Sequence, residues 1–240
     1  MIYILSDIHG QYERYKAILE KIDLQDEDTL YVLGDVIDRG PASLQILFDI
    51  MERPNAHMFL GNHEHMMLTY LEGSDRESWF YGVNGGARTY EAYLKQDEKT
   101  RQKIVDYLLN ETIIKKDLWI GNTRYILSHT SALIDGVDMY TRDYKDNLME
   151  IQDIVWNMGY YDTSRIGEFE KSDVPTYFIS GHIITRRLKD DDEIFIQSFS
   201  NNYTWIDIDC GCAMGSEFGY LACLRIDETD GQIKEVIYMR

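Results

Sequence analysis

The stretch Leu33-Gly34-Asp35-Val36-Ile37-Asp38-Arg39-Gly40-Pro41 decides how the chain is organised. The hydrophobic run at residues 30–33 ends here, and glycines, carboxylates, an arginine and a proline follow at once. A buried strand that stops on Gly-Asp places a carboxylate at its carboxyl end, where open α/β sheets usually carry their chemistry. The alternative is an ordinary strand-to-helix turn in which Asp38 or Ser43 caps the next helix. The rest of the chain has to decide between the two.

Hydrophobic runs and helix-forming segments alternate on either side of this stretch. Strands are predicted at residues 2–5, 30–33 and 56–60, and helices at residues 12–22, 41–51 and 62–71. This βαβαβα order predicts a parallel sheet with right-handed crossovers. Further strands, expected to pair antiparallel, are predicted at residues 123–127, 177–180, 193–197, 205–208, 219–226 and 232–238. The chain is therefore expected to have an α/β fold.

Residues 73–117 have a different character, with aromatic residues among glycines and then a charged amphipathic segment at residues 98–110. We interpret this range as a helical insertion in a single domain that spans residues 1–240. It is either a lid over the site or a helical layer packed on the sheet, and both interpretations stay open. Residues 135–175 are expected to be irregular, apart from a helix near residues 148–156.

The composition limits the partners that the chain can bind. With 240 residues, of which 44% are hydrophobic, the chain can bury a substantial core. Its formal net charge of −18 argues against nucleic acid and anionic membrane as general partners, because both attract basic surfaces. An anionic substrate would have to be held locally, by arginines or metal ions.

The cysteines and the first residues indicate the compartment. Cys210, Cys212 and Cys223 are too few for a disulfide framework and lack the spacing of a zinc site, so we interpret them as core residues. The first residues are too short and too little basic for a signal peptide. No run approaches the roughly 18 apolar residues of a membrane span. We therefore expect a cytoplasmic protein.

Residues of metal-ligand type follow five of the predicted strands. In chain order these are Asp7 and His9; Asp35, Asp38 and Arg39; Asn62, His63 and Glu64; His129; and His182. One such residue after a strand is more often a hydrogen-bonded structural group than a ligand. Five strands that each end in this way favour a site, because core packing does not require His or Asp at those places.

The donor atoms of these side chains suit a pair of transition-metal ions. Asp, His and Asn offer mixed oxygen and nitrogen ligation, which favours Mn, Fe or Zn over all-oxygen calcium sites and thiolate sites. Two ions about 4 Å apart would share a carboxylate and a hydroxide, and a bound water with a pKa of about 7 provides hydroxide at neutral pH. Arg39 can hold a phosphate oxygen with its planar guanidinium.

The ordered motifs Asp-x-His-Gly, Gly-Asp-x-x-Asp-Arg-Gly and Gly-Asn-His-Glu, followed by a single His and a Gly-His, resemble those of the calcineurin-like metallophosphoesterases. Residues 34–41 resemble the phosphoprotein phosphatase branch, which includes bacterial and phage Ser/Thr phosphatases and symmetrical diadenosine tetraphosphatases. Trp79 and Asn84-Gly85-Gly86 are similar to the bacterial and phage members. The resemblance implies an α/β fold of two packed mixed β-sheets flanked by helices.

The resemblance also implies roles for the motif residues. Two divalent metal ions, expected to be Mn with Fe or Zn as alternatives, would be held by Asp7, His9, Asp35, Asn62, His129 and His182. Asp35 would bridge the two ions, with Asp7 and His9 on the first ion and the other three ligands on the second. His63, oriented by Asp38, would protonate the leaving oxygen as a metal-bridging hydroxide attacks phosphorus, and Arg39 would bind the phosphate. We expect His57 and His65 to be structural, and Glu64 to support the site from the start of its helix.

Two features depart from the pattern of the branch. The single histidine, usually found in His-Ala-Gly, lies here in His129-Thr130-Ser131. A second phosphate-binding arginine, often found in Trp-x-Arg, is missing from Val155-Trp156-Asn157-Met158-Gly159, and Arg142, Arg165 or Arg186 would have to replace it. Loss of one charge-assisted contact would cost roughly 1.5–3 kcal/mol of phosphate binding. The substrate is therefore less well defined than the chemistry.

Three functions remain in competition. The first is a Ser/Thr-type protein phosphatase or broad phosphomonoesterase that acts on a phosphorylated substrate. The alternative is a symmetrical bis(5′-nucleosyl)-tetraphosphatase-like phosphoanhydride hydrolase, in which Trp79, Tyr81 or Trp156 would stack on a base. The third is a metal-binding scaffold without catalysis, which the missing arginine suggests. The intact set of Asp38, Arg39 and His63 opposes the scaffold, because a scaffold needs no acid.

Overall fold

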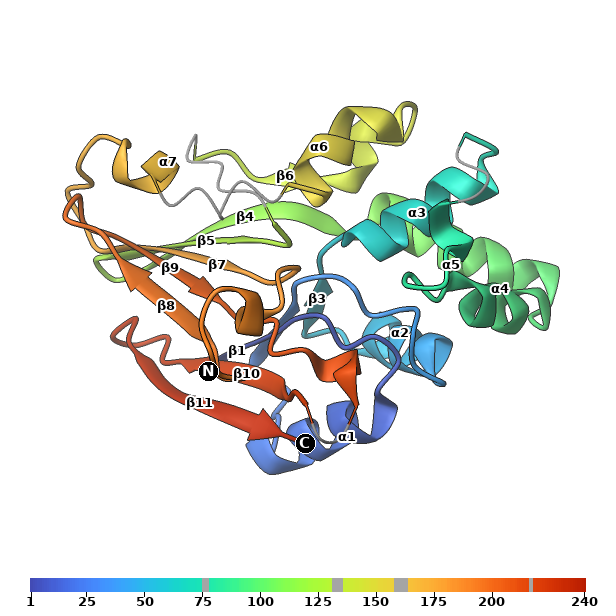
Figure 1. The fold of residues 1–240 in the computed structure, drawn as a ribbon, viewed down its shortest axis with the longest axis horizontal. Coiled ribbons are helices and arrows are strands. Elements are labelled where there is room, and N and C mark those ends of the chain that lie inside the picture. The colour runs from blue at the N-terminus through green and yellow to red at the C-terminus, as the bar shows by residue number, and fades with distance from the viewer. Residues whose placement is uncertain (75–77, 131–135, 158–163, 216–217) are drawn as a thin grey trace.

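Two β-sheets pack face to face, and helices flank them (Figure 1). The structure is a computed structural model, and it describes residues 1–74, 78–130, 136–157, 164–215 and 218–240. The expected α/β fold of two packed mixed sheets with flanking helices is confirmed.

The first sheet has the strand order β11–β10–β1–β2–β3. Its strands are β1 (Ile2–Leu5), β2 (Thr29–Val32), β3 (Ala56–Met58), β10 (Leu221–Ile226) and β11 (Ile233–Met239). The first three strands are parallel, as their alternation with helices predicts, and the last two join the sheet antiparallel. The carboxyl ends of β1, β2 and β3 therefore lie at one edge.

The second sheet has the order β6–β4–β5–β7–β9–β8. Its strands are β4 (Ile113–Ile120), β5 (Thr123–Ser128), β6 (Met139–Tyr140), β7 (Thr176–Ser180), β8 (Phe195–Ser198) and β9 (Tyr203–Asp207). Strands β5, β7 and β9 pair in parallel, so the expectation that the later strands are antiparallel is wrong for these three. A parallel pair needs a long crossover, and the segment between β5 and β7 is long enough to provide one.

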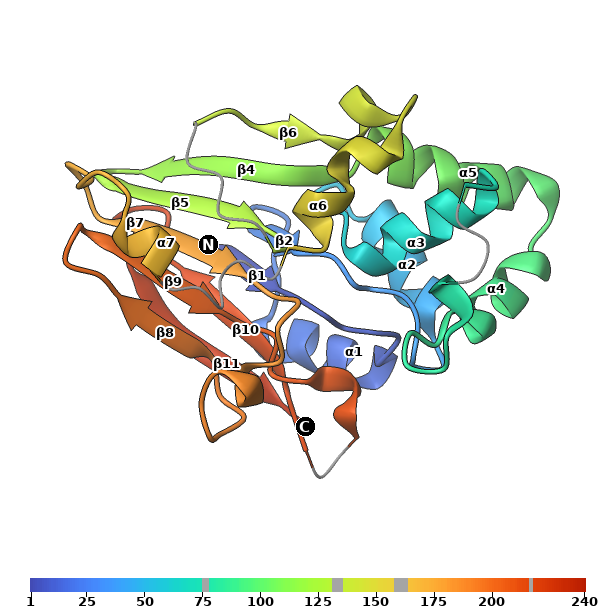
Figure 2. The same ribbon diagram turned by 45° about the horizontal axis from the view of Figure 1, so that its top comes forward.

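The helices of the first half gather mostly at one end of the sheets (Figures 1 and 2). They are α1 (Tyr12–Ile22), α2 (Ser43–Glu52), α3 (Asn62–Leu71), η1 (Ser78–Phe80), α4 (Gly86–Leu94) and α5 (Glu98–Asn110). Shorter helical turns are η2 (Thr141–Tyr144), η3 (Leu148–Ile151), α6 (Gln152–Val155), α7 (Ser164–Gly167), η5 (Thr185–Arg187) and η6 (Cys212–Met214). Strand β4 begins inside the range 73–117, so the expectation that this whole range is helical is wrong for residues 113–117. Within the described ranges, no helix is long and apolar enough to cross a membrane.

The alternation of side chains along β1 divides the core into two layers. Successive residues of a strand point to opposite faces of the sheet. Ile4 therefore packs with Leu127 between the two sheets, whereas Leu5 packs with Ile18 and Leu47 beneath the helices. All three cysteines are buried and free, as expected for core residues.

One carboxylate holds the backbone that follows β2. Glu64 accepts hydrogen bonds from the backbone N–H groups of Asp35 (2.9 Å), Val36 (2.9 Å) and Ile37 (3.2 Å). It also accepts one from Gly61 (3.0 Å), just before α3. Burial raises the pKa of Glu64 to about 7, while these backbone donors act in the opposite direction. The side chain thereby ties the exit of β2 to the start of α3.

Replacement of Glu64 tests this support. Glu64→Ala leaves four buried N–H groups without their acceptor, and each costs about 1–3 kcal/mol when unpaired. We expect urea denaturation to show that the free energy of unfolding falls by at least about 3 kcal/mol, and by less for Glu64→Gln. Glu72→Ala, at the exposed end of the same helix, is the control. Equal effects at Glu64 and Glu72 would contradict the assigned role.

Candidate metal centre

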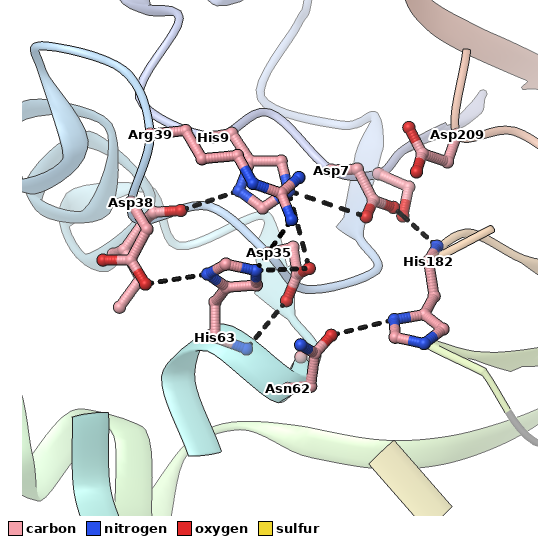
Figure 3. Close-up of polar contacts among 12 residues, drawn as sticks. Asp7, His9, Asp35, Asp38, Arg39, Asn62, His63, His182 and Asp209 are labelled. Carbon is pink, nitrogen blue, oxygen red and sulfur yellow. Dashed lines mark hydrogen bonds and ion pairs between the residues drawn. The ribbon is translucent and has the colours of Figure 1, made fainter. Parts of the chain in front are cut away.

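The segments that follow β1, β2, β3, β5 and β7 bring together the nine side chains that were expected to bind metal, bind phosphate or take part in catalysis. These are Asp7, His9, Asp35, Asp38, Arg39, Asn62, His63, His129 and His182, most of which are drawn in Figure 3. They come from distant parts of the chain, and only the fold places them side by side.

The backbone at these positions is conformationally unusual. Among the described residues, eight that are not glycine have a positive φ, and six of them belong to the selected set: Asp7, His9, Asp35, Asp38, Arg39 and His182. Non-glycine residues rarely adopt this conformation, which is stored mainly where the surrounding structure enforces it for function. The strained backbone is an observation separate from the chemistry of the side chains, and it identifies the same segments as functional.

The first group of possible metal ligands is formed by His9, Asp35 and His63. The Nδ1 atom of His9 lies 2.9 Å from the carbonyl oxygen of Ile37, which can only accept, so Nδ1 carries the proton. The lone pair of His9 Nε2 is then directed into the site, 3.6 Å from Asp35 Oδ2. Asp7 lies at the edge of this group, with its Oδ1 atom 4.0 Å from the same nitrogen.

The second group is formed by Asp35, His129 and His182, with the amide of Asn62 between the two rings. His129 donates from Nδ1 to the carbonyl oxygen of Leu33 (2.6 Å), which leaves Nε2 as an acceptor. That nitrogen lies 3.0 Å from Asn62 Oδ1 and 3.5 Å from Asp35 Oδ1. His129 Nε2, Asn62 Oδ1 and Asp35 Oδ1 thus converge as acceptors without a proton between them, an arrangement that suits a cation.

The electrostatics of the buried groups also fit cations. Burial raises the pKa values of Asp7 and Asp35 well above the usual range, and neighbouring carboxylates raise them further. Burial likewise lowers the pKa values of His9 and His129. A bound cation favours the deprotonated form of both residue types and would offset these costs. The donor set therefore fits two divalent ions, with Asp35 common to both groups.

His63 and Asp38 form a buried pair beside the two groups. His63 Nδ1 lies 2.8 Å from Asp38 Oδ2, and the indole N–H of Trp79 donates to the same oxygen (2.7 Å). Burial raises the pKa of Asp38 to about 7, and the hydrogen bonds from Thr89 and Trp79 oppose this shift. Sequence reasoning missed this role of Trp79, which is only 1% exposed and so is not available to stack on a base.

The segment that contains α4 packs on the Asp38–Arg39 loop. Thr89 accepts a hydrogen bond from the backbone N–H of Asp38 (3.1 Å). Gly85 has a φ of +78°, and a Cβ atom there would lie 2.8 Å from the backbone nitrogen of Arg39. These contacts favour a packed helical layer over a lid that moves freely. That residues 1–240 form a single domain with a helical insertion stays a prediction.

A cavity of about 250 Å³ opens onto the site. Arg39 and His63 line it, together with Trp156, Arg187 and Asp209. The last two residues were not selected from the sequence. Asp209 follows β9, so the rule that polar residues after strands mark the site would have found it. Arg187 offers no such signal.

The other residues singled out from the sequence lie as follows. His57 is exposed on β3, and His65 bonds through Nε2 to the carbonyl oxygen of Leu148 (2.9 Å), so neither reaches the site. Beside His129, the hydroxyl of Thr130 donates to the carbonyl oxygen of Ile154. Ser131, Met158 and Gly159 lie outside the described residues.

Comparisons with known proteins support the same chemistry. Residues 1–202 match the family model described as calcineurin-like phosphoesterase. The chain is 27% identical to serine/threonine-protein phosphatase 2 of Escherichia coli (strain K12) over 214 residues, which cover 88% of this chain and 87% of that protein. It is 32% identical over 114 residues to a symmetrical bis(5′-nucleosyl)-tetraphosphatase of Buchnera aphidicola subsp. Acyrthosiphon pisum (strain Tuc7), an alignment that covers 41% of each.

A solved structure shows likeness of fold. The cold-active protein-tyrosine phosphatase of a psychrophilic Shewanella species aligns with the whole of this chain and 80% of its own. The TM-score is 0.54 and the sequence identity is 17%. At this level of sequence identity, the comparison shows that the two proteins share a fold and nothing about a shared function.

The shared carboxylate predicts how metal binding responds to mutation. Because Asp35 belongs to both ligand groups, we expect Asp35→Ala to reduce metal content at both positions. Elemental analysis after dialysis against Mn²⁺ measures this, with the exposed-site variant Asp26→Ala as the control. Two ions still bound to Asp35→Ala would refute the bridging role.

Proposed function

We propose a function for this chain on the premise that it belongs to the calcineurin-like phosphoesterases, a membership shown by the match over residues 1–202. The family inferred from the motifs is thereby confirmed, and the chain is a metal-dependent phosphoester hydrolase. The family depends on two metal ions, and the structure holds two ligand groups that fit them. The observation that carries the proposal is the carboxylate of Asp35, which is common to both groups.

We propose two Mn²⁺ ions as the resident metals, because mixed imidazole and carboxylate donors suit this ion. His9 and Asp35 of the first group would hold the first ion together with Asp7, which lies at the edge of that group, whereas His63 is assigned to proton transfer. Asp35, Asn62, His129 and His182 would hold the second ion. When bound, the ions supply positive charge and an activated water for attack on phosphorus.

The chain's own residues bind the phosphate and move the proton. The guanidinium of Arg39 donates to His9 Nε2 (2.6 Å) and to His63 Nε2 (3.1 Å). Once the lone pair of His9 Nε2 binds an ion, the guanidinium would be released into the cavity that Arg39 lines, where it would hold a phosphate oxygen. Burial and the charge of Arg39 lower the pKa of His63 well below its usual value. A phosphate dianion would raise that pKa, because an opposite charge favours the imidazolium. His63 could then donate its Nε2 proton to the leaving oxygen, while Asp38 orients the ring.

The surroundings of the cavity favour a phosphorylated peptide side chain as the substrate. Trp156 lines both the cavity and a second hollow of about 620 Å³, which Met66, Thr69 and Met149 also line. Among the described residues, no lysine or arginine lines this second hollow. It suits a neutral, partly apolar extension of the substrate better than a chain of further phosphates. The relative that aligns over most of its length is named a Ser/Thr phosphatase.

A phosphoanhydride of the dinucleoside tetraphosphate type is the second candidate substrate. The observation in its favour is Trp156, which is 37% exposed where the two hollows meet and offers a face for a nucleobase. The buried Asp38–His63 pair fits both candidates, and it opposes a scaffold without catalysis.

A substrate panel separates the two candidates. We expect Mn²⁺-loaded protein to hydrolyse p-nitrophenyl phosphate and phosphothreonine peptides, with a higher kcat/KM for the peptides than for diadenosine tetraphosphate. Protein treated with a chelator should be inactive until Mn²⁺ is restored. A preference for the dinucleotide would favour the second candidate. Absence of hydrolysis throughout the panel would contradict the proposed function.

His63→Asn tests the proton donor. We expect the variant to retain its metal ions but to lower kcat by roughly 10²–10⁴-fold on substrates with poor leaving groups. The decrease should be smaller on p-nitrophenyl phosphate, because its leaving group needs no proton. His57→Asn, which changes an exposed histidine on β3, is the matched control. An unchanged kcat with a poor leaving group would remove His63 from this role.

A further inference from the structure

The described arginines that were expected to replace the missing second one lie away from the cavity. Arg142 lies over the ring of Tyr140, 4.1 Å from its centroid, and does not line the cavity. Arg186 forms an ion pair with Asp192 (2.9 Å) and also lies over the ring of Phe218, so it is engaged away from the site. The side chain of Arg165 lies outside the described residues. Neither of the two described candidates reaches the phosphate position.

Arg187, the neighbour of Arg186, does line the cavity. Arg39 and Arg187 are its basic lining residues within the described ranges, apart from the histidines. No described carboxylate lies within ion-pairing distance of the Arg187 side chain, which is exposed. Its charge still acts on Asp209 in the same cavity, where it opposes the rise in pKa that burial causes. Because it forms no close ion pair with a described residue, the guanidinium is available for an anion that enters the site.

The backbone around Arg187 is well anchored. The turn η5 starts shortly after His182, and the buried Thr185 donates its N–H to the carbonyl oxygen of Asp209 (2.8 Å). The N–H of Arg187 bonds to the carbonyl oxygen of Ile184 (2.8 Å). This anchoring fixes the backbone of Arg187 beside the cavity, and the charge of the side chain contributes to the low pKa of His182, after burial and Arg39.

We propose that Arg187 is the second phosphate-binding arginine of this enzyme and binds the same phosphoryl group as Arg39. The inference rests on the proposed function, since it requires a phosphate in the cavity. Arg39 comes from the exit of β2 and Arg187 from the turn after β7, so the two guanidinium groups approach from separate loops. Two guanidinium groups together can donate hydrogen bonds to more oxygens of a phosphate dianion than a single guanidinium can. Arg187 thus takes the place of the arginine that the stretch after Trp156 lacks.

Binding of inorganic phosphate to the Mn²⁺-loaded protein tests this inference. We expect Arg187→Ala to weaken phosphate about tenfold, both in isothermal titration calorimetry and as a competitive inhibitor of p-nitrophenyl phosphate hydrolysis. KM should rise more than kcat falls, and Arg187→Lys should restore part of the affinity. Because Arg187 is exposed, the difference from wild type should shrink as salt is raised. Arg186→Ala is the matched control and should bind phosphate like wild type.

Several outcomes would overturn the inference. Phosphate binding by Arg187→Ala that is as tight as in wild type would exclude a specific role for Arg187, and so would an equal loss of phosphate affinity in Arg186→Ala. Weakened binding of pyrophosphate with unchanged binding of phosphate would place Arg187 on a second phosphate and also contradict it. Wild-type protein that binds phosphate but hydrolyses no ester would refute the proposed function alone, and the phosphate titrations would still decide the role of Arg187.

Discussion

The site depends on the hydrogen bonds that the Glu64 carboxylate accepts from the loop after β2. Four backbone N–H groups converge on one buried side chain, from Asp35, Val36, Ile37 and Gly61. These bonds hold Asp35 in a conformation with positive φ that a non-glycine residue would not choose. They also fix the start of α3, which carries Asn62 and His63. A single carboxylate thus sets the relative positions of two strand exits.

Burial is the second constraint, and it explains why the site needs cations. The fold places the carboxylates of Asp7, Asp35 and Asp209 away from water, where burial raises their pKa values. Among the described residues that line the cavity, Arg39 and Arg187 carry the arginine charge. Two divalent ions would supply the missing positive charge while leaving the imidazoles neutral, as metal ligation requires. The same acidity would repel a phosphate, and for this reason we propose that arginines bind it together with the ions.

The local elements and the strand-exit residues could be predicted because both depend on nearby sequence. The apolar periodicity of residues 12–22 fixes the bounds of α1, and Asp or His directly after an apolar run identifies the site. Strand β4 was not predicted at all, because lysines interrupt its apolar pattern, although Lys115 is fully buried in the structure. The parallel pairing of β5, β7 and β9 depends on how the chain returns through a long crossover, and no local pattern shows that.

Side chains that act through tertiary contacts were the hardest to find. The bond from Trp79 to Asp38 and the position of Arg187 at the cavity both join segments that are far apart in sequence. The central claim is that Asp35 lies between two metal ions, and anomalous X-ray scattering from crystals of the Mn²⁺-loaded protein tests it most directly. The account predicts two anomalous peaks on either side of the Asp35 carboxylate, one beside His9 and one beside His129 and His182. A single peak, or peaks that do not contact Asp35, would contradict it.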